Sequence, residues 1–282
     1  MNNEIIGRSN NYGMAAVEES TSIAEIQAKM ILARNFPRNI DTCLEHIKRE
    51  CENKELAEKA TYEFPRGDSV VKGPSIRLVE CVARHWGNIL SGIKEISSSE
   101  REATVKAYCW DLETNFADEK VFTVPYVRTT KKSGKIPLTD ERDKYETMAN
   151  MAARRKRACM QAIIPQFVID EAVEACQRTL EEEMKGKNIE DVKKSMLDAF
   201  RLKAEWITEA SFETVIGKPF DNISTKDIIK LRNLYNAIND GFVKPEVAFK
   251  RESESPVTDP AAADALVAVN KLVGDNVNGT EQ

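Results

Sequence analysis

The residues best suited to do chemistry are ten cations that lie close together in the middle of the chain. The same segment holds four acids, so its charge is about +6 in a chain of net charge −5. Closely spaced lysines and arginines neutralise phosphates, which makes a polyanion the favoured ligand. The alternative is a solvated helix face, the common meaning of a charge run. The cations are Arg128, Lys131, Lys132, Lys135, Arg142, Lys144, Arg154, Arg155, Lys156 and Arg157.

Arg155 has an unusual place in the helix expected over residues 139–164. At 100° per residue it falls inside an apolar stripe. A lone arginine on such a face is costly unless it has a partner. Two partners remain open: a carboxylate of the same chain, or a phosphate of a bound polyanion. The stripe consists of Met148, Met151, Ala152, Cys159 and Ala162.

Aromatic side chains alternate with cations on two expected strands. Rings beside cations on an open sheet can stack bases and neutralise phosphates without reading their sequence. The same rings can instead pack as core beneath a helix, and both interpretations stay open. The residues are Lys106, Tyr108 and Trp110 on the first strand, and Phe122, Tyr126 and Arg128 on the second.

Several catalytic motifs are missing from the sequence. Gly217-Lys218 is followed by Pro219 and not by the hydroxyl residue of a phosphate-binding loop, so an ATP-driven motor is not expected. No G-x-S-x-G occurs. Cys43, His46 and Cys51 follow helical spacing but lack a fourth ligand, so we expect neither a metal site nor a catalytic residue.

Cysteine usage and the chain start indicate the compartment. The six cysteines form no C-x-x-C pair and most have apolar neighbours, which is typical of reduced core cysteines. The first residues show no basic segment followed by an apolar run, and no stretch approaches about 18 apolar residues. We expect a cytoplasmic protein.

The elements that position the basic segment predict an α+β fold. An amphipathic helix over 76–86 precedes three strand candidates at 88–96, 102–112 and 120–128, of which the last two form a β-hairpin. A basic loop over 128–137 leads into the long basic helix. We expect a three-stranded antiparallel sheet packed against helices.

The flanking regions suggest four parts. We expect a disordered N-terminus over 1–20, an α+β core over 21–184, a helical C-terminal module over 185–250 and an acidic disordered tail over 251–282. Within the core, helices are expected up to about Tyr62, followed by a turn-rich segment. Pro125 predicts that its strand lies at a sheet edge or is bulged.

Three segments are similar to those of a family of phage recombination proteins. They are GPSIRLVECVARHWGNI at 73–89, WDLETN at 110–115 with FTVPYVR at 122–128, and ETMANMAARRKRACMQAIIPQFVIDEAVEAC at 146–176. The order of helix, hairpin and Ala/Arg-rich helix resembles the core of phage single-strand annealing proteins, the broad RecT/Redβ, Erf and Rad-type group. Residues 212–249 resemble C-terminal helical segments of phage recombination proteins. The resemblance covers about residues 60–250.

This resemblance implies ATP-independent binding of single-stranded DNA and strand annealing in phage homologous recombination, in the host cytoplasm. It implies a homo-oligomeric ring or filament, and a phage exonuclease or a host single-strand-binding protein as partner. No nucleotide cofactor is implied, and Mg²⁺ would only accompany DNA. The expected DNA-binding residues are Lys106, Tyr108, Tyr126, Arg128, Lys131, Lys132, Lys135, Arg154, Arg155, Lys156 and Arg157.

Two rival functions remain. The first is a replication or recombination accessory protein whose basic patch binds an acidic protein, which predicts little affinity for bare oligonucleotides. The second is a metal-dependent nuclease that uses carboxylates distant in sequence, which predicts cleavage that a chelator stops.

Overall fold

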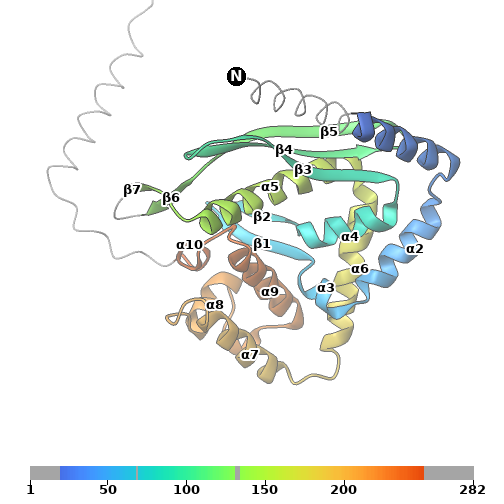
Figure 1. The fold of residues 1–282 in the computed structure, drawn as a ribbon. Helices are drawn as coiled ribbons and strands as arrows, with labels where there is room; N and C mark the ends of the chain where they lie inside the picture. The colour runs from blue at the N-terminus through green and yellow to red at the C-terminus, as the bar shows by residue number, and fades with distance from the viewer. Residues whose placement is uncertain (1–19, 68, 131–133, 251–282) are drawn as a thin grey trace, which may run out of the picture.

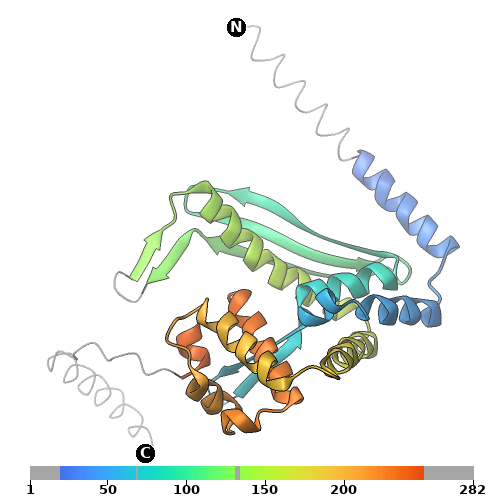
Figure 2. The same ribbon diagram turned by 90° about the horizontal axis from the view of Figure 1, so that it is seen from below.

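The computed structural model describes residues 20–67, 69–130 and 134–250. A three-stranded antiparallel sheet has helices on one face, and a group of shorter helices lies beyond them (Figures 1 and 2). The expected α+β class is therefore confirmed. The disorder expected for the N-terminus and for the tail over 251–282 falls outside the described residues, apart from Ser20, which is helical.

The N-terminal region is helical, as its amphipathic pattern predicts. A helix over 20–35 ends before Pro37. Helix α2 (Ile40–Cys51) begins where the Asn39 side chain accepts a hydrogen bond from the Thr42 amide at 3.0 Å. Helix α3 (Lys54–Glu58) is short. The helix expected up to Tyr62 is wrong, because the chain enters a strand after Ala60.

Strands β1 (Thr61–Arg66) and β2 (Ser69–Pro74) form an antiparallel hairpin where the sequence predicted only turns. Tyr62 pairs with Gly73, and its ring lies across that glycine. A Cβ at Gly73 would stand 2.7 Å from the Tyr62 hydroxyl oxygen, so only glycine fits beneath the ring. The turn-forming residues of this segment therefore obscured the β1–β2 hairpin in the sequence. Gly73 is needed there for the packing of the Tyr62 ring and not for a turn.

The central sheet has the order β3 (Ile89–Ser98), β4 (Glu102–Asp111), β5 (Phe116–Pro125). Helix α4 (Ile76–Trp86) precedes it and is capped by Ser75. Alternate residues of β4 are buried, including Val105, Ala107 and Cys109, as the alternation predicted. Pro125 ends an edge strand, also as predicted.

The segment between the sheet and the long helix is a hairpin, β6 (Val127–Thr130) and β7 (Gly134–Pro137), and not the expected loop. Helix α5 (Glu141–Ile163) starts at Asp140, whose carboxylate accepts bonds from two backbone amides of the first turn. Helix α6 (Gln166–Met184) follows Pro165. Both helices match the sequence prediction closely.

The remaining described chain is helical. Its elements are α7 (Ile189–Arg201), α8 (Glu209–Ile216), the 3₁₀ turn η1 (Phe220–Asn222), α9 (Thr225–Asn239) and α10 (Pro245–Ala248). These helices share a hydrophobic cluster with Tyr62, Phe64 and Val71 of the β1–β2 hairpin. A separate cluster joins α2, α4, α5, α6 and the inner face of β4. The hairpin from the expected core thus packs into the C-terminal helices.

Two further expectations can be compared with the structure. All six cysteines are free and buried, as the sequence predicted. None of the helices in the described part of the chain has both the length and the apolar character needed to cross a membrane.

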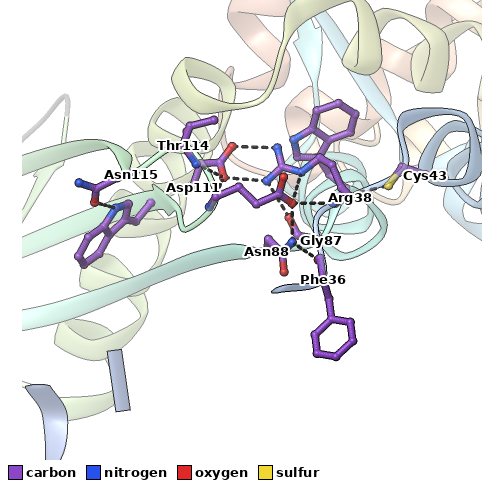
Figure 3. A network of polar contacts seen from close by, with 11 residues as sticks. Phe36, Arg38, Cys43, Gly87, Asn88, Asp111, Thr114 and Asn115 are labelled. Carbon is purple, nitrogen blue, oxygen red and sulfur yellow. Dashed lines mark hydrogen bonds and ion pairs between the residues drawn. The ribbon is translucent and has the colours of Figure 1, made fainter. Parts of the chain in front are cut away.

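Arg38 connects three separate chain segments (Figure 3). Its guanidinium donates to both carboxylate oxygens of Asp111, at 2.7 and 2.8 Å, and to Glu113 at 3.1 Å. It also donates to the Gly87 carbonyl at 3.4 Å and lies over the Trp86 ring. Arg38 is only 10% exposed and Asp111 only 6%. The start of α2, the end of α4 and the β4–β5 turn are thereby held together.

Replacement of Arg38 by Met should destabilise the chain by about 3–5 kcal/mol, because the buried Asp111 and the partly buried Glu113 would lose their cation. Urea unfolding followed by circular dichroism measures this loss. The double variant Arg38→Met, Asp111→Asn should lose less than the sum of the two single variants. Additive losses would show that the pair is not coupled.

Asp227 stabilises the start of α9 through its charge. Burial raises its pKa, but donors from Ser224 and Lys218 outweigh burial and lower the pKa to about 2. The Lys218 ammonium stands 2.9 Å from the carboxylate, and the Ser224 hydroxyl stands 2.6 Å away. Because the folded pKa is depressed, the stabilisation is complete above the unfolded pKa and is lost as pH falls through the folded value.

Asp227→Asn should therefore cost about 2 kcal/mol at neutral pH, given about 1.4 kcal/mol per pKa unit. The difference from the unmodified chain should shrink below about pH 4. Urea unfolding at neutral and at acidic pH tests this. Asp191→Asn, at an exposed carboxylate in the first turn of α7, serves as the control and should show little change.

Candidate nucleic-acid interface

Helix α5 presents two different faces. One face packs on the sheet through Ala152 and Cys159, which are buried, and through the half-buried Met148 and Met151. This is the stripe that the sequence predicted, except that Ala162 is exposed. The other face carries Arg154 and Arg157 toward the C-terminal helices. Its neighbours there are aromatic.

Arg154 and Arg157 stack on rings from two distant parts of the chain. The Arg154 guanidinium lies 4.7 Å from the centre of the Phe242 ring and donates to the Gly241 carbonyl at 2.9 Å. Arg157 lies 4.8 Å from the Tyr62 ring centre and 5.2 Å from that of Phe242. The two rings are themselves stacked at 4.5 Å. Two cations and two rings thus form one layered cluster.

This cluster separates two adjoining hollows, of about 340 and 610 Å³, which share Arg154, Arg157 and Phe242. We call the hollows and the cluster together the arginine groove. Its walls come from α5, the β1–β2 hairpin, the start of α4, the end of α9 and the segment between α9 and α10. The charged residues that line it are Arg66, Arg77, Arg154, Arg157, Lys244 and Asp240.

The charge of the arginine groove is strongly positive. Asp240 is the single acid among the described lining residues, and it pairs with Arg77 at 3.2 Å. Neither Arg154 nor Arg157 forms an ion pair within residues 20–67, 69–130 and 134–250. Burial lowers the pKa of both guanidiniums, although arginine stays charged at neutral pH. Asp240 attracts both guanidiniums, but among the described residues its direct ion pair is with Arg77, so a phosphate would supply a counter-charge in contact with Arg154 and Arg157.

The adjacent cations of α5 are engaged elsewhere. Arg155 lies over the Phe122 ring at 5.0 Å, and no carboxylate of the described chain pairs with it. The carboxylate partner weighed for Arg155 is therefore not found there, and the aromatic ring takes its place. Lys156 pairs with Glu80 of α4 at 2.8 Å. Neither side chain lines the arginine groove.

The remaining basic residues do not converge on the groove as expected. Arg128 pairs with Asp143 at 3.1 Å, near the start of α5. Since α5 rises about 1.5 Å per residue, Asp143 and Arg154 are about 16 Å apart along it. Lys135 is exposed on β7. Lys131 and Lys132 lie outside the described residues.

The expected aromatic platform is divided between the two faces of the sheet. Tyr108 and Trp110 lie on the outer face, where Lys106 pairs with Glu119. The Tyr108 ring lies across Gly92, its partner on β3. Tyr126 is buried on the opposite face, against the α5 side. Side chains on a strand alternate between the two faces of the sheet. Lys106 and Tyr108 belong to the outer face of β4, whereas Tyr126 packs with Ala103 and Val105 on its inner face, so the three cannot form one surface.

The sequence interpretation missed the residues that complete the groove. Tyr62 and Phe64 alternate along β1, but Pro65 and Gly67 dominated the pattern as turn residues. Phe242 follows Gly241 in a helix break and gave no periodic signal. Period-two spacing at Tyr62 and Phe64 was the one usable signal.

Comparison of the chain with protein-family models, curated proteins and solved structures found no match.

Proposed function

We propose that this chain binds single-stranded DNA in the arginine groove and anneals complementary strands without ATP. The observation that carries the proposal is the pair of half-buried guanidiniums, Arg154 and Arg157, stacked on Tyr62 and Phe242 with no carboxylate partner in the described chain. Rings hold the cations in place, and a phosphate backbone would neutralise them. Such a site is blind to base sequence, as strand annealing requires.

The mechanism needs no chemical step. Arginine side chains at the groove fix the backbone, and the bases stay free to pair with a second strand. Phosphate neutralisation lowers the repulsion between two strands, and base pairing drives the reaction. Because the central segments of the chain resemble those of phage recombination proteins, we assign the annealing to phage-type recombination. The working form would be a homo-oligomer. An exonuclease or a single-strand-binding protein would be its partner.

Charge at the groove is tested by paired substitutions. One double variant, Arg154→Gln with Arg157→Gln, removes both positive charges. The other, Arg154→Lys with Arg157→Lys, keeps both charges and loses only the stacking of the planar guanidinium on the rings. The Gln variant should bind a fluorescent oligothymidylate at least about tenfold more weakly, a loss of about 1.4 kcal/mol. The Lys variant should bind nearly as well as the unmodified chain. Fluorescence anisotropy gives both affinities.

A matched control removes the same charge elsewhere. The control is the double variant Arg178→Gln with Lys185→Gln. Arg178 lies on α6, Lys185 follows its last residue, and both side chains are exposed. It should leave the affinity nearly unchanged. The Gln variant at the groove should also reduce the salt slope by about 1.4, at roughly 0.7 per phosphate contact. Equal binding by the Gln and Lys variants would remove the groove from the proposal.

Annealing itself is measured with two complementary labelled oligonucleotides, without ATP and over a salt series. The purified chain should accelerate annealing, lose the effect as salt rises, and leave both strands intact. Absence of binding would favour the acidic-protein partner. Cleavage in Mg²⁺ that a chelator stops would establish the nuclease instead.

A further inference from the structure

A second cluster of reactive side chains lies between α2 and α4, and none of its residues lines the arginine groove. Cys81 and His85 are four residues apart on α4, so both point to the same side of that helix. Glu50 lies on α2, and His46 precedes it by four residues on the same helix. The two helices pack against each other, which brings both pairs together.

The donor atoms are close enough to share one ion. One atom each from Glu50, Cys81 and His85 lie within 4.8 Å of one another. Bonds of about 2.0–2.3 Å in a tetrahedral zinc site put the ligand atoms roughly 3.3–3.8 Å apart. The Glu50 side chain is 45% exposed, so it can turn inward by this small amount. The His46 ring centre lies 6.0 Å from that of His85, and His46 is exposed.

The contacts of His85 point to a missing ligand. Its Nε2 atom is buried, yet it has no hydrogen-bond partner within the part of the chain that the structure describes. The nearest Glu50 oxygen stands 3.6 Å away, beyond hydrogen-bonding distance. A buried ring nitrogen without a partner costs free energy. A metal ion among the three donors would bond to this nitrogen and remove that cost.

We propose that Cys81, His85 and Glu50 bind a zinc-class divalent ion, with His46 beside the fourth position. Thiolate and imidazole donors select zinc over magnesium or calcium, which prefer oxygen. The ion would join α2 to α4 beside the main hydrophobic cluster to which both helices contribute, so its role is structural. The cluster lies apart from the proposed DNA site and does not depend on it.

Metal binding is tested on the full-length chain after chelation and dialysis, with Co²⁺ as a spectroscopic probe. We expect one Co²⁺ per chain, visible bands of tetrahedral coordination, and a near-ultraviolet band from thiolate to cobalt. Zn²⁺ should displace the Co²⁺ and raise the melting temperature. Absence of the thiolate band in the unmodified chain would overturn the proposal.

Variants assign the ligands. Cys81→Ser should abolish the thiolate band, and His85→Gln should weaken Co²⁺ binding at least about tenfold. Cys109→Ser is the matched control, since Cys109 is also a buried free cysteine but is outside the donor set. A thiolate band that survives in Cys81→Ser, or that is lost equally in Cys109→Ser, would contradict the assignment.

X-ray absorption on the unmodified chain avoids any folding defect of the variants. The zinc edge should show one sulfur together with nitrogen and oxygen neighbours. A shell of nitrogen and oxygen alone would mean that surface histidines bind the ion, and it would overturn the proposal.

Discussion

The stacking of α5 arginines on aromatic rings is the interaction on which the rest of the arrangement depends. Helix α5 packs on the sheet with one face, through Ala152 and Cys159, and on the C-terminal cluster with another, through Arg154 and Arg157. An arginine can serve at such a boundary because its guanidinium plane stacks on a ring while its edge still donates hydrogen bonds. Aliphatic residues there would join the two hydrophobic clusters without leaving charge for a ligand. The same contacts thus assemble the fold and create the positive groove.

The Arg38 network has the complementary role at the far end of the sheet. It binds the start of α2, the turn after α4 and the β4–β5 turn to one guanidinium, with carboxylates that are almost fully buried (Figure 3). Buried ion pairs contribute little net stability, but removal of one partner is costly, so they fix geometry more than they add free energy. The network holds α2 against α4, and the Cys81, His85 and Glu50 cluster lies between those two helices. The Arg38 network therefore also fixes the relative position of the two helices that carry the candidate metal ligands.

Both proposals rest on polar groups whose pairing within the described chain is incomplete. Arg154 and Arg157 have rings where carboxylates usually stand, and His85 has a buried nitrogen without a hydrogen bond. Proteins satisfy most buried polar groups, so such exceptions indicate ligand sites more reliably than charge density does. Charge density alone did not show that Lys156 and Arg128 already pair with Glu80 and Asp143. A basic segment is therefore a weaker guide than the pairing state of each cation.

The sequence by itself determined most of the local elements of this protein, but not the β1–β2 and β6–β7 hairpins. Caps at Asn39, Ser75 and Asp140, and the alternation along β4 and β5, specified helices and strands because these signals act over a few residues. The α+β class and the basic helix followed from them. Only the tertiary structure decided which cations remain free of carboxylates, and that Tyr62 and Phe242 meet Arg154 and Arg157 across nearly two hundred residues. Only it brought Glu50 to Cys81 and His85. Contacts between distant segments depend on how whole elements pack together. The residue pattern along one helix or strand does not specify which other element will pack against it.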